Sequence, residues 1–196
     1  DFINKLTKFF SNKKEDLITH KKFDELFAKA IKPHALQDAI ALNYISVSKK
    51  FDTNSYGDFG LSHWEEIRPK TMRAKAYLVI RKHQKPMHFK KIAESINKAG
   101  FDKRMALPQT VHNELIKDTR FILVGRGIYG LKEFGLMPGT AREVIARLIK
   151  TKGPLSSSEV VNLTLEQRVL KKGTILLNLQ NKKNFKRLPN GRYHLA

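Results

Sequence analysis

The stretch RFILVGRGIYGLKEFG, residues 120–135, decides the fold. Its glycines have the spacing G-x-G-x-x-G, and they follow an apolar Phe-Ile-Leu-Val run that predicts a β-strand. A dinucleotide-binding fingerprint has this spacing, but it needs a helix directly after the glycines and an acidic residue about 20 positions later. Here the glycines are followed by residues 131–135, Leu-Lys-Glu-Phe-Gly, which alternate like a second strand. We therefore expect the glycines to turn a β-hairpin and not to hold a nucleotide.

The same hairpin pattern occurs three times along the chain. An aromatic residue, a small or polar residue and a leucine stand at 59–61, 129–131 and 193–195, which are 70 and 64 positions apart. Each copy follows a glycine-bearing turn, and each turn follows a strand-like segment, at 45–47, 121–124 and 185–188. The first hairpin would carry an insertion, because its two strands are further apart in sequence. An internal repeat of this kind predicts one structural unit used three times.

Upstream of each hairpin, apolar residues recur with the spacing of three helices. In the second copy a helix is expected to start at Pro108, and in the third copy Ser156 and Glu159 form a capping-box pattern. The helices are expected at 9–10, 23–27 and 35–42, at 76–80, 88–96 and 108–115, and at 144–149, 156–161 and 175–179. Three helices followed by a two-stranded wing make a winged helix-turn-helix.

The sequence therefore predicts a mainly α fold with small β-hairpins, arranged as three tandem winged helix-turn-helix modules. Their boundaries are expected beside Pro69 and Pro138, because proline interrupts regular structure. The three modules would span residues 1–68, 72–136 and 139–196. The chain begins with Asp1 and not with methionine, so we expect it to be a fragment or a processed product.

The charge of the chain indicates its partner. The 196 residues include 38 basic and 18 acidic side chains, for a formal net charge of +20 and an isoelectric point near 10.2. Such an excess repels itself, and it is typical of proteins that bind a polyanion. Double-stranded DNA is the partner we expect, with an anionic membrane surface as the alternative. No apolar run approaches the roughly 20 residues of a membrane span, and no signal-peptide pattern opens the chain.

The basic charge is unevenly distributed among the predicted modules. Residues 1–70 carry 12 basic and 10 acidic side chains, residues 71–135 carry 14 and 5, and residues 136–196 carry 12 and 3. The second and third modules therefore have the electrostatic character of DNA-binding domains, which we expect them to present on one side. The nearly neutral, Phe-rich first module is expected to contact a protein.

The second module resembles the HARE-type winged helix family. The resemblance rests on Gln84-Lys85-Pro86-Met87-His88-Phe89-Lys90-Lys91-Ile92 and on residues 121–131, and it is best over residues 72–136. That family includes the N-terminal domain of the bacterial RNA polymerase delta subunit, domains of chromatin proteins and domains attached to restriction endonucleases. In some bacterial proteins such a domain follows a sigma-factor-like region. The resemblance implies a role in transcription or on DNA without catalysis, although the acidic tail of the delta subunit is missing here.

The expected DNA contacts follow from the way a winged helix docks. Its third helix enters the major groove, and its wing contacts the backbone or the minor groove. The second module would contribute Gln109, Thr110, His112, Asn113, Lys117, Arg120 and Arg126. The third module would contribute Lys172, Thr174, Asn178, Asn181, Lys182, Lys183, Lys186, Arg187 and Arg192. Asn113 and Asn178 could read adenine or could merely be exposed, while Lys98, Lys103 and Lys150 are expected to be solvated surface.

Several function classes lack their residues in this chain. Without cysteine there are no disulfides and no thiolate metal sites, which suits a reducing compartment; we expect a cytoplasmic protein, associated with the nucleoid if it is bacterial. No H-E-x-x-H motif occurs, and residues 136–196 hold only Glu143, Glu159 and Glu166, whereas a nuclease clusters carboxylates around its metal. We therefore expect no enzyme, metal or cofactor. The alternatives are a protein-interaction scaffold associated with RNA polymerase, or an RNA-binding protein.

Overall fold

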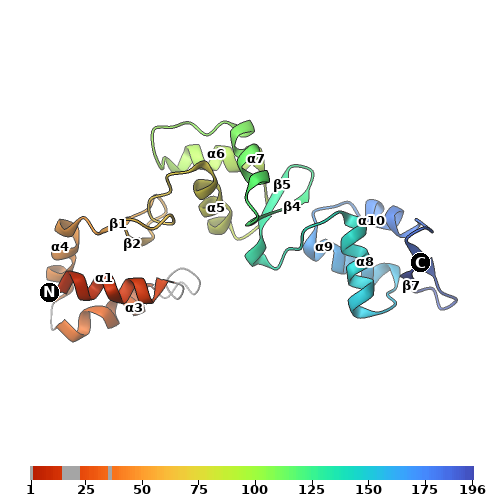
Figure 1. The fold of residues 1–196 in the computed structure, drawn as a ribbon, viewed down its shortest axis with the longest axis horizontal. Coiled ribbons are helices and arrows are strands. Elements are labelled where there is room, and N and C mark those ends of the chain that lie inside the picture. The colour runs from red at the N-terminus through yellow and green to blue at the C-terminus, as the bar shows by residue number, and fades with distance from the viewer. Residues whose placement is uncertain (1, 15–22, 35–36) are drawn as a thin grey trace. The chain divides into compact units, whose positions relative to one another are not determined.

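The structure is a computed structural model that describes residues 2–14, 23–34 and 37–196. The chain is mainly helical, with small antiparallel sheets (Figure 1). Its backbone divides into two compact units, of which the first is Asp1–Lys75 with Asn97–Met105 and the second is Ala76–Ile96 with Ala106–Ala196. All of the residues that we expect at DNA therefore belong to the second unit.

The first unit begins with helices that gather around phenylalanine rings. Its described elements are α1 (Phe2–Asn12), α3 (Phe23–Ile31), the 3-10 helix η1 (Lys32–His34), α4 (Asp38–Ser48), β1 (Phe51–Thr53) and β2 (Phe59–Leu61). Phe10 is completely buried, and its ring meets those of Phe27, Phe51 and Phe59 edge-on, with centroids 5.4–6.3 Å apart. Such edge-to-face pairs add to the free energy gained by burying the rings.

One predicted strand of this unit is wrong. Residues 45–47 form the last turns of α4, and the first strand begins only at Phe51. The helix continues because Ile45 packs into the core on the same face as Ala41, and it ends where Lys49 adopts a left-handed conformation with φ 54°. Since the hairpin starts at Phe51, it has no insertion. Ala35, where the sequence predicted this helix to begin, lies outside the described residues.

Trp64 packs beneath the first hairpin. Its side chain is 5 % exposed, and a Cβ atom on Gly60 of β2 would lie 2.8 Å from the indole Cε3. Close by, the amide of Asn54 donates to the carboxylate of Asp58 at 3.0 Å and to the backbone carbonyl of Glu66 at 2.9 Å. These bonds close the turn of the hairpin onto the segment that carries Trp64.

The next part of the chain has three helices and a three-stranded sheet. The elements are α5 (Met72–His83), β3 (Met87–His88), α6 (Phe89–Ala99), α7 (Pro108–Lys117), β4 (Phe121–Gly125) and β5 (Ile128–Leu131). The sheet has the antiparallel order β3-β5-β4. All three expected helices and the hairpin are confirmed. The expected strand at 131–135 is wrong beyond Leu131, because η2 (Lys132–Phe134) follows and Gly135 ends it with φ 75°.

The last part of the chain has three helices and a hairpin around one apolar core. The elements are α8 (Ala141–Lys152), α9 (Ser157–Gln167), α10 (Lys172–Leu179), β6 (Phe185–Arg187) and β7 (Tyr193–Leu195). The capping box predicted at Ser156 and Glu159 is confirmed, and α8 begins with a second one at Thr140 and Glu143. The buried centre includes Ile145, Val160, Ile175 and Phe185.

The three hairpins share one pairing register. A phenylalanine of the first strand lies opposite the leucine of the second strand in Phe51–Leu61, Phe121–Leu131 and Phe185–Leu195. Register is set by the apolar pattern and by the turn, and a slip of one residue would turn the buried face outward. The shared register is therefore the structural counterpart of the aromatic-x-Leu repeat in the sequence.

Each glycine of the G-x-G-x-x-G stretch is required by a different feature of the structure. Gly127 turns the hairpin with φ 67°, which L-residues rarely adopt. Gly130 is buried in β5, where a Cβ atom would overlap the Cδ1 of Leu136. Gly125 adjoins the carbonyl oxygen of Val169, which would lie 2.8 Å from a Cβ atom. The spacing is thus explained by a hairpin and its packing, as the sequence predicts.

Candidate nucleic-acid interface

Helix α7 presents a polar face to solvent because its apolar residues are buried on the opposite side. Pro108 occupies the first turn, and Val111 and Leu115 are at most 1 % exposed in the core. Gln109, Thr110, Asn113 and Lys117, which we expect at DNA, are all exposed. Lys117 approaches Glu114 at 3.5 Å, an exposed pair of the kind that contributes little to stability. The helix therefore offers amide, hydroxyl and ammonium groups to a ligand.

His112 lies differently from its neighbours on α7. Its ring is half-buried, with the centroid 4.6 Å from that of Phe89 and 5.7 Å from that of Tyr129. Its Nδ1 is buried without a hydrogen-bond partner in the described part of the chain. His112 is therefore less open to solvent than Gln109, Thr110, Asn113 and Lys117. Its ring connects α7 to the β4–β5 hairpin.

His88 accepts a hydrogen bond at the start of α6, as a helix cap does. Its Nδ1 accepts a hydrogen bond from the backbone N–H of Lys90 at 3.3 Å, in the first turn of α6. The same ring stacks on Phe89 with centroids 4.5 Å apart. His88 is thus part of the support beneath the hairpin turn.

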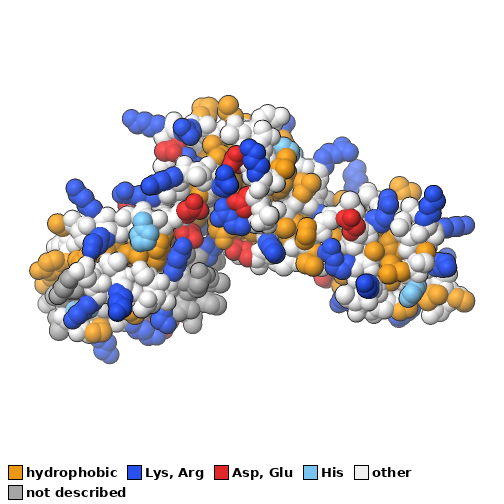
Figure 2. Space-filling model, in the orientation of Figure 1, with side chains coloured by type: hydrophobic (Ala, Val, Ile, Leu, Met, Phe, Trp, Pro, Cys, Tyr) orange, Lys and Arg blue, Asp and Glu red, His pale blue; other side chains and the backbone are white. Residues whose placement is uncertain are grey.

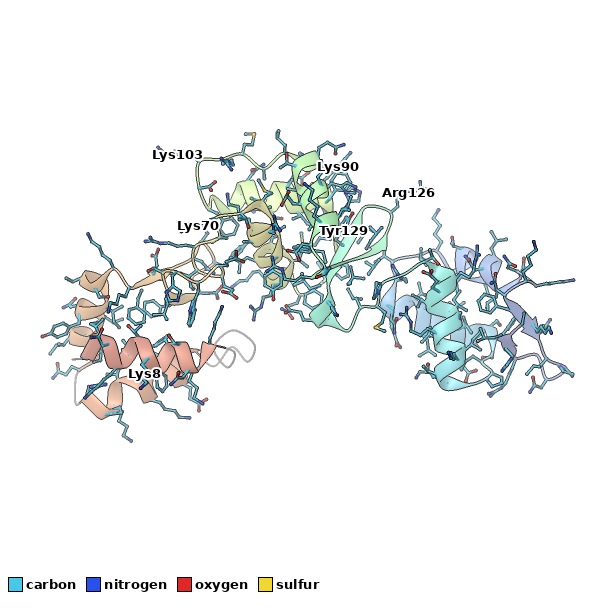
Figure 3. The ribbon with its side chains drawn as sticks, in the orientation of Figure 1. Lys8, Lys70, Lys90, Lys103, Arg126 and Tyr129 are labelled. Atoms are coloured by element: carbon cyan, nitrogen blue, oxygen red, sulfur yellow. The ribbon has the colours of Figure 1, made fainter. Side chains whose placement is uncertain are left out.

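The tip of the β4–β5 hairpin carries one exposed guanidinium. Arg126 stands between Gly125 and Gly127 and points away from the hairpin (Figure 3). Arg120, at the base, differs from the expected phosphate contact: its Nη2 is 2.7 Å from Asp118, and its guanidinium lies 4.9 Å above the ring of Tyr77. Since Arg120 already has a carboxylate partner, Arg126 is the better candidate for a phosphate.

Helix α10 offers fewer unengaged polar groups than the sequence predicts. Lys172 and Thr174 are exposed near its start. Asn178 is half-buried, and its Nδ2 donates to the carbonyl of Thr174 at 2.8 Å, so its amide already serves the helix. Asn181 accepts from the backbone N–H of Lys183 at 3.1 Å and shapes the turn after the helix. The simple structural roles are favoured for both asparagines.

The basic residues after α10 remain exposed. Lys182 and Lys183 lie in the turn, and Lys186 and Arg187 lie on β6. Arg192 is exposed as well, although its Nη1 also donates to the carbonyl of Pro154 at 3.1 Å. This group therefore supplies cationic side chains from a turn and a hairpin that are adjacent in the sequence.

On the face that Figure 2 shows, positive charge alone does not locate the interface. Figure 2 shows Lys and Arg side chains spread over the visible face and interleaved with apolar and acidic ones. This face does not gather its Lys and Arg side chains into one patch. The helix-and-hairpin geometry, and not a charge patch, distinguishes the candidate residues.

Exposed apolar residues on the third helices were missed by the sequence reasoning. Ile116 of α7 is 63 % exposed, and Leu177 of α10 is 69 % exposed. On α4 the exposed apolar residues are Ile40, Tyr44 and Val47, with Val47 80 % exposed. A helix with apolar residues on every face can be recognised in the sequence. Helical periodicity, however, places these apolar residues in the core and does not mark the ones that stay exposed.

Neither a metal-binding cluster nor a membrane-spanning helix is found among the described residues. No group of three or more His, Asp or Glu side chains within 2–14, 23–34 and 37–196 is arranged to hold a metal ion. Across the same ranges, no helix has the length and apolar character to cross a membrane.

The comparisons with known proteins concern the segment that contains α5, α6, α7 and the β4–β5 hairpin. No curated protein and no solved structure matches the chain. A family model does match about a third of it, over the segment whose sequence resembles the HARE-type winged helix. Residues 70–134 match the model of the HARE-HTH family, a winged helix-turn-helix family whose description names the restriction endonuclease HTH domain.

Proposed function

We propose that this protein binds double-stranded DNA through the third helix and the hairpin of two successive winged-helix modules. The observation that carries the proposal is the HARE-HTH match at residues 70–134, whose third helix has a solvent-facing row of Gln109, Thr110 and Asn113. Glutamine and asparagine can pair with adenine through two hydrogen bonds, each such pair worth about 1–3 kcal/mol of base discrimination. Arg126 at the hairpin tip would contact a phosphate or the minor groove.

The repeated architecture extends the proposal to the C-terminal part of the chain. We propose three tandem modules, over residues 1–68, 72–136 and 139–196, on the strength of the shared hairpin register and the recurring order of helices and strands in the described residues. The third module has a net charge of +9, equal to that of residues 71–135. Lys172, Lys182 and Lys183 would neutralise phosphates.

The biological setting that we propose is transcription, in the cytoplasm and at the nucleoid if the protein is bacterial. The resemblance of residues 72–136 to a family that includes an RNA polymerase subunit domain supports this setting. The protein would act without catalysis, metal or cofactor, and RNA polymerase would be a protein partner.

Charge reversal tests the DNA interface. The triple variant Arg126→Glu, Lys182→Glu and Lys183→Glu should weaken duplex binding at least a hundredfold, because it removes three phosphate contacts and adds repulsion. The matched control reverses Lys98, Lys103 and Lys150, which are exposed lysines outside the proposed interface, and changes the net charge equally. Equal weakening in both variants would mean that only overall charge matters. Competition between matched RNA and DNA duplexes would reveal a preference for RNA.

A second candidate function, protein docking, is favoured by one observation on the first module. Ile40, Tyr44 and Val47 of α4 are 43 %, 56 % and 80 % exposed and stand at the i, i+4 and i+7 positions of one helix face. The helix carries no Lys or Arg, so its exposed face suits a protein better than a phosphate backbone.

The docking function is tested separately from DNA binding. The double variant Tyr44→Glu and Val47→Glu should abolish binding to purified RNA polymerase and leave duplex binding unchanged. Unchanged polymerase binding would remove α4 as the docking surface.

A further inference from the structure

Arg168 is buried at the point where the second and third proposed modules meet, inside the second compact unit. Its side chain is 6 % exposed, and no other arginine among the residues that the structure describes is buried. The guanidinium donates to the backbone carbonyls of Leu123 in β4 and of Met137 and Gly139 in the connecting segment, with 3.1 Å to Met137. One side chain from the third module thus bonds to the sheet of the second and to two carbonyls of the connecting segment.

The backbone beside Arg168 makes a second connection. The N–H of Val169 donates to the carbonyl of Val124 at 2.9 Å, so this segment attaches to β4, one of the two edge strands of the β3-β5-β4 sheet. The carbonyl of Val169 also lies against Gly125, where a Cβ atom would come within 2.8 Å of it. The first glycine of the G-x-G-x-x-G stretch therefore permits this close approach.

Arginine suits this place for a chemical reason. Its planar guanidinium presents several N–H donors in fixed directions and keeps its charge even where burial lowers its pKa, whereas a lysine ammonium is a compact charge on a flexible stem. Buried polar groups are usually hydrogen-bonded, and here the Nη1 and Nη2 atoms donate to backbone carbonyls, whereas Nε is buried without a hydrogen-bond partner among the described residues. Glu143, in the first turn of α8, adds a favourable negative charge, while Arg147 opposes it.

We propose that Arg168 is a positioning residue that fastens the third module to β4, so that the two modules bind one continuous duplex as a single unit. This inference rests on the proposed DNA-binding function. With the contacts made, binding of either the second or the third module brings the other to the DNA without further loss of orientational freedom. With the contacts broken, residues 135–140, which include Gly135, Pro138 and Gly139, act as a flexible tether.

The test compares short and long duplexes. Wild type should bind a duplex of about 20–30 base pairs at least a hundredfold more tightly than one of about 10 base pairs, because only the longer one reaches both modules. Arg168→Ala and Arg168→Lys should reduce this ratio at least tenfold and leave binding to the short duplex unchanged. Arg142→Ala, which removes an exposed charge from α8, is the control and should keep the wild-type ratio.

A readout without DNA separates this inference from the proposed function. In NMR relaxation, amides of β4 and of α8 should share one rotational correlation time in wild type and acquire different, shorter times in Arg168→Ala. Gly125→Ala should have the same effect through its clash with Val169, which provides a second variant if Arg168→Ala does not fold. Common tumbling in both variants would overturn the positioning role. Failure of wild type to bind either duplex, with coupled tumbling intact, would overturn only the DNA-binding function.

Discussion

Replacing Gly127 by alanine tests the explanation of the G-x-G-x-x-G stretch. The φ of Gly127 is 67°, and an L-residue in this left-handed conformation costs about 1–2 kcal/mol. A Cβ atom would also lie 2.8 Å from the Nε2 of His88 and 3.0 Å from the Cδ1 of Phe89. The Phe89 ring already packs against that of His112, so relieving the overlap would cost about 1–3 kcal/mol more. We expect Gly127→Ala to destabilise the hairpin by about 2–5 kcal/mol.

Gly135 supplies a matched control for the backbone strain alone. Its φ is 75°, and nothing lies within 4 Å of the position of a Cβ atom. Gly135→Ala should therefore cost only about 1–2 kcal/mol, partly offset by about 0.4–1 kcal/mol because alanine restricts the unfolded chain. The difference between the two variants isolates the steric part of the Gly127 effect.

Native-state hydrogen exchange of residues 121–131 is the appropriate assay, because it reports the local opening free energy of the hairpin. Trp64 fluorescence would report on the first unit instead, where this residue packs. Equal destabilisation by Gly127→Ala and Gly135→Ala would refute the reasoning. A large stabilisation of these amides by a dinucleotide would also contradict it, because the hairpin interpretation leaves no nucleotide to bind.

Two further predictions concern polar groups that hold the helices in place. The ammonium of buried Lys75 lies 2.5 Å from the carboxylate of Asp102, and this hydrogen bond lowers the pKa of Asp102. The stability that the pair contributes is therefore fully present above about pH 4, the ordinary pKa of an aspartate, and is lost as the pH falls through the lowered pKa. The melting temperature of the wild type should therefore fall between pH 5 and pH 2, and that of Asp102→Asn should fall less. Equal pH dependence in the two proteins would contradict the role assigned to the Lys75–Asp102 pair. Thr140→Ala and Ser156→Ala should each cost about 0.5–2 kcal/mol in urea unfolding through loss of a helix cap, whereas Ser157→Ala should cost little.

Most helices, the second and third hairpins and the second strand of the first hairpin could be predicted from the sequence because their signals are local. Apolar spacing marks α6, and a capping box marks the start of α9. The two errors in secondary structure arose where the local signal was ambiguous. Residues 45–47 have strand propensity, but burial of Ile45 keeps them in α4. Residues 131–135 are expected from the sequence to form a second strand, but Gly135 closes residues 132–134 into a 3-10 turn.

The candidate site could be predicted only in part, because some of its side chains are positioned by residues that are distant in the sequence. Exposure of Gln109 and Asn113 follows from their place opposite the buried face of α7. The positions of His112 and Arg120 depend on Phe89 and Tyr77, which are distant in sequence. The contacts of Arg168 span 29 to 45 residues and have no local pattern at all.

The salt dependence of duplex binding tests the central claim most directly. If the modules bind DNA mainly by neutralising about six to ten phosphates, a logarithmic plot of affinity against salt concentration is linear. Between about 50 and 200 mM salt, fluorescence anisotropy should then show a loss of affinity of about a thousandfold or more. Duplex binding that is absent at the lowest salt, or that does not change across this range, would contradict the account.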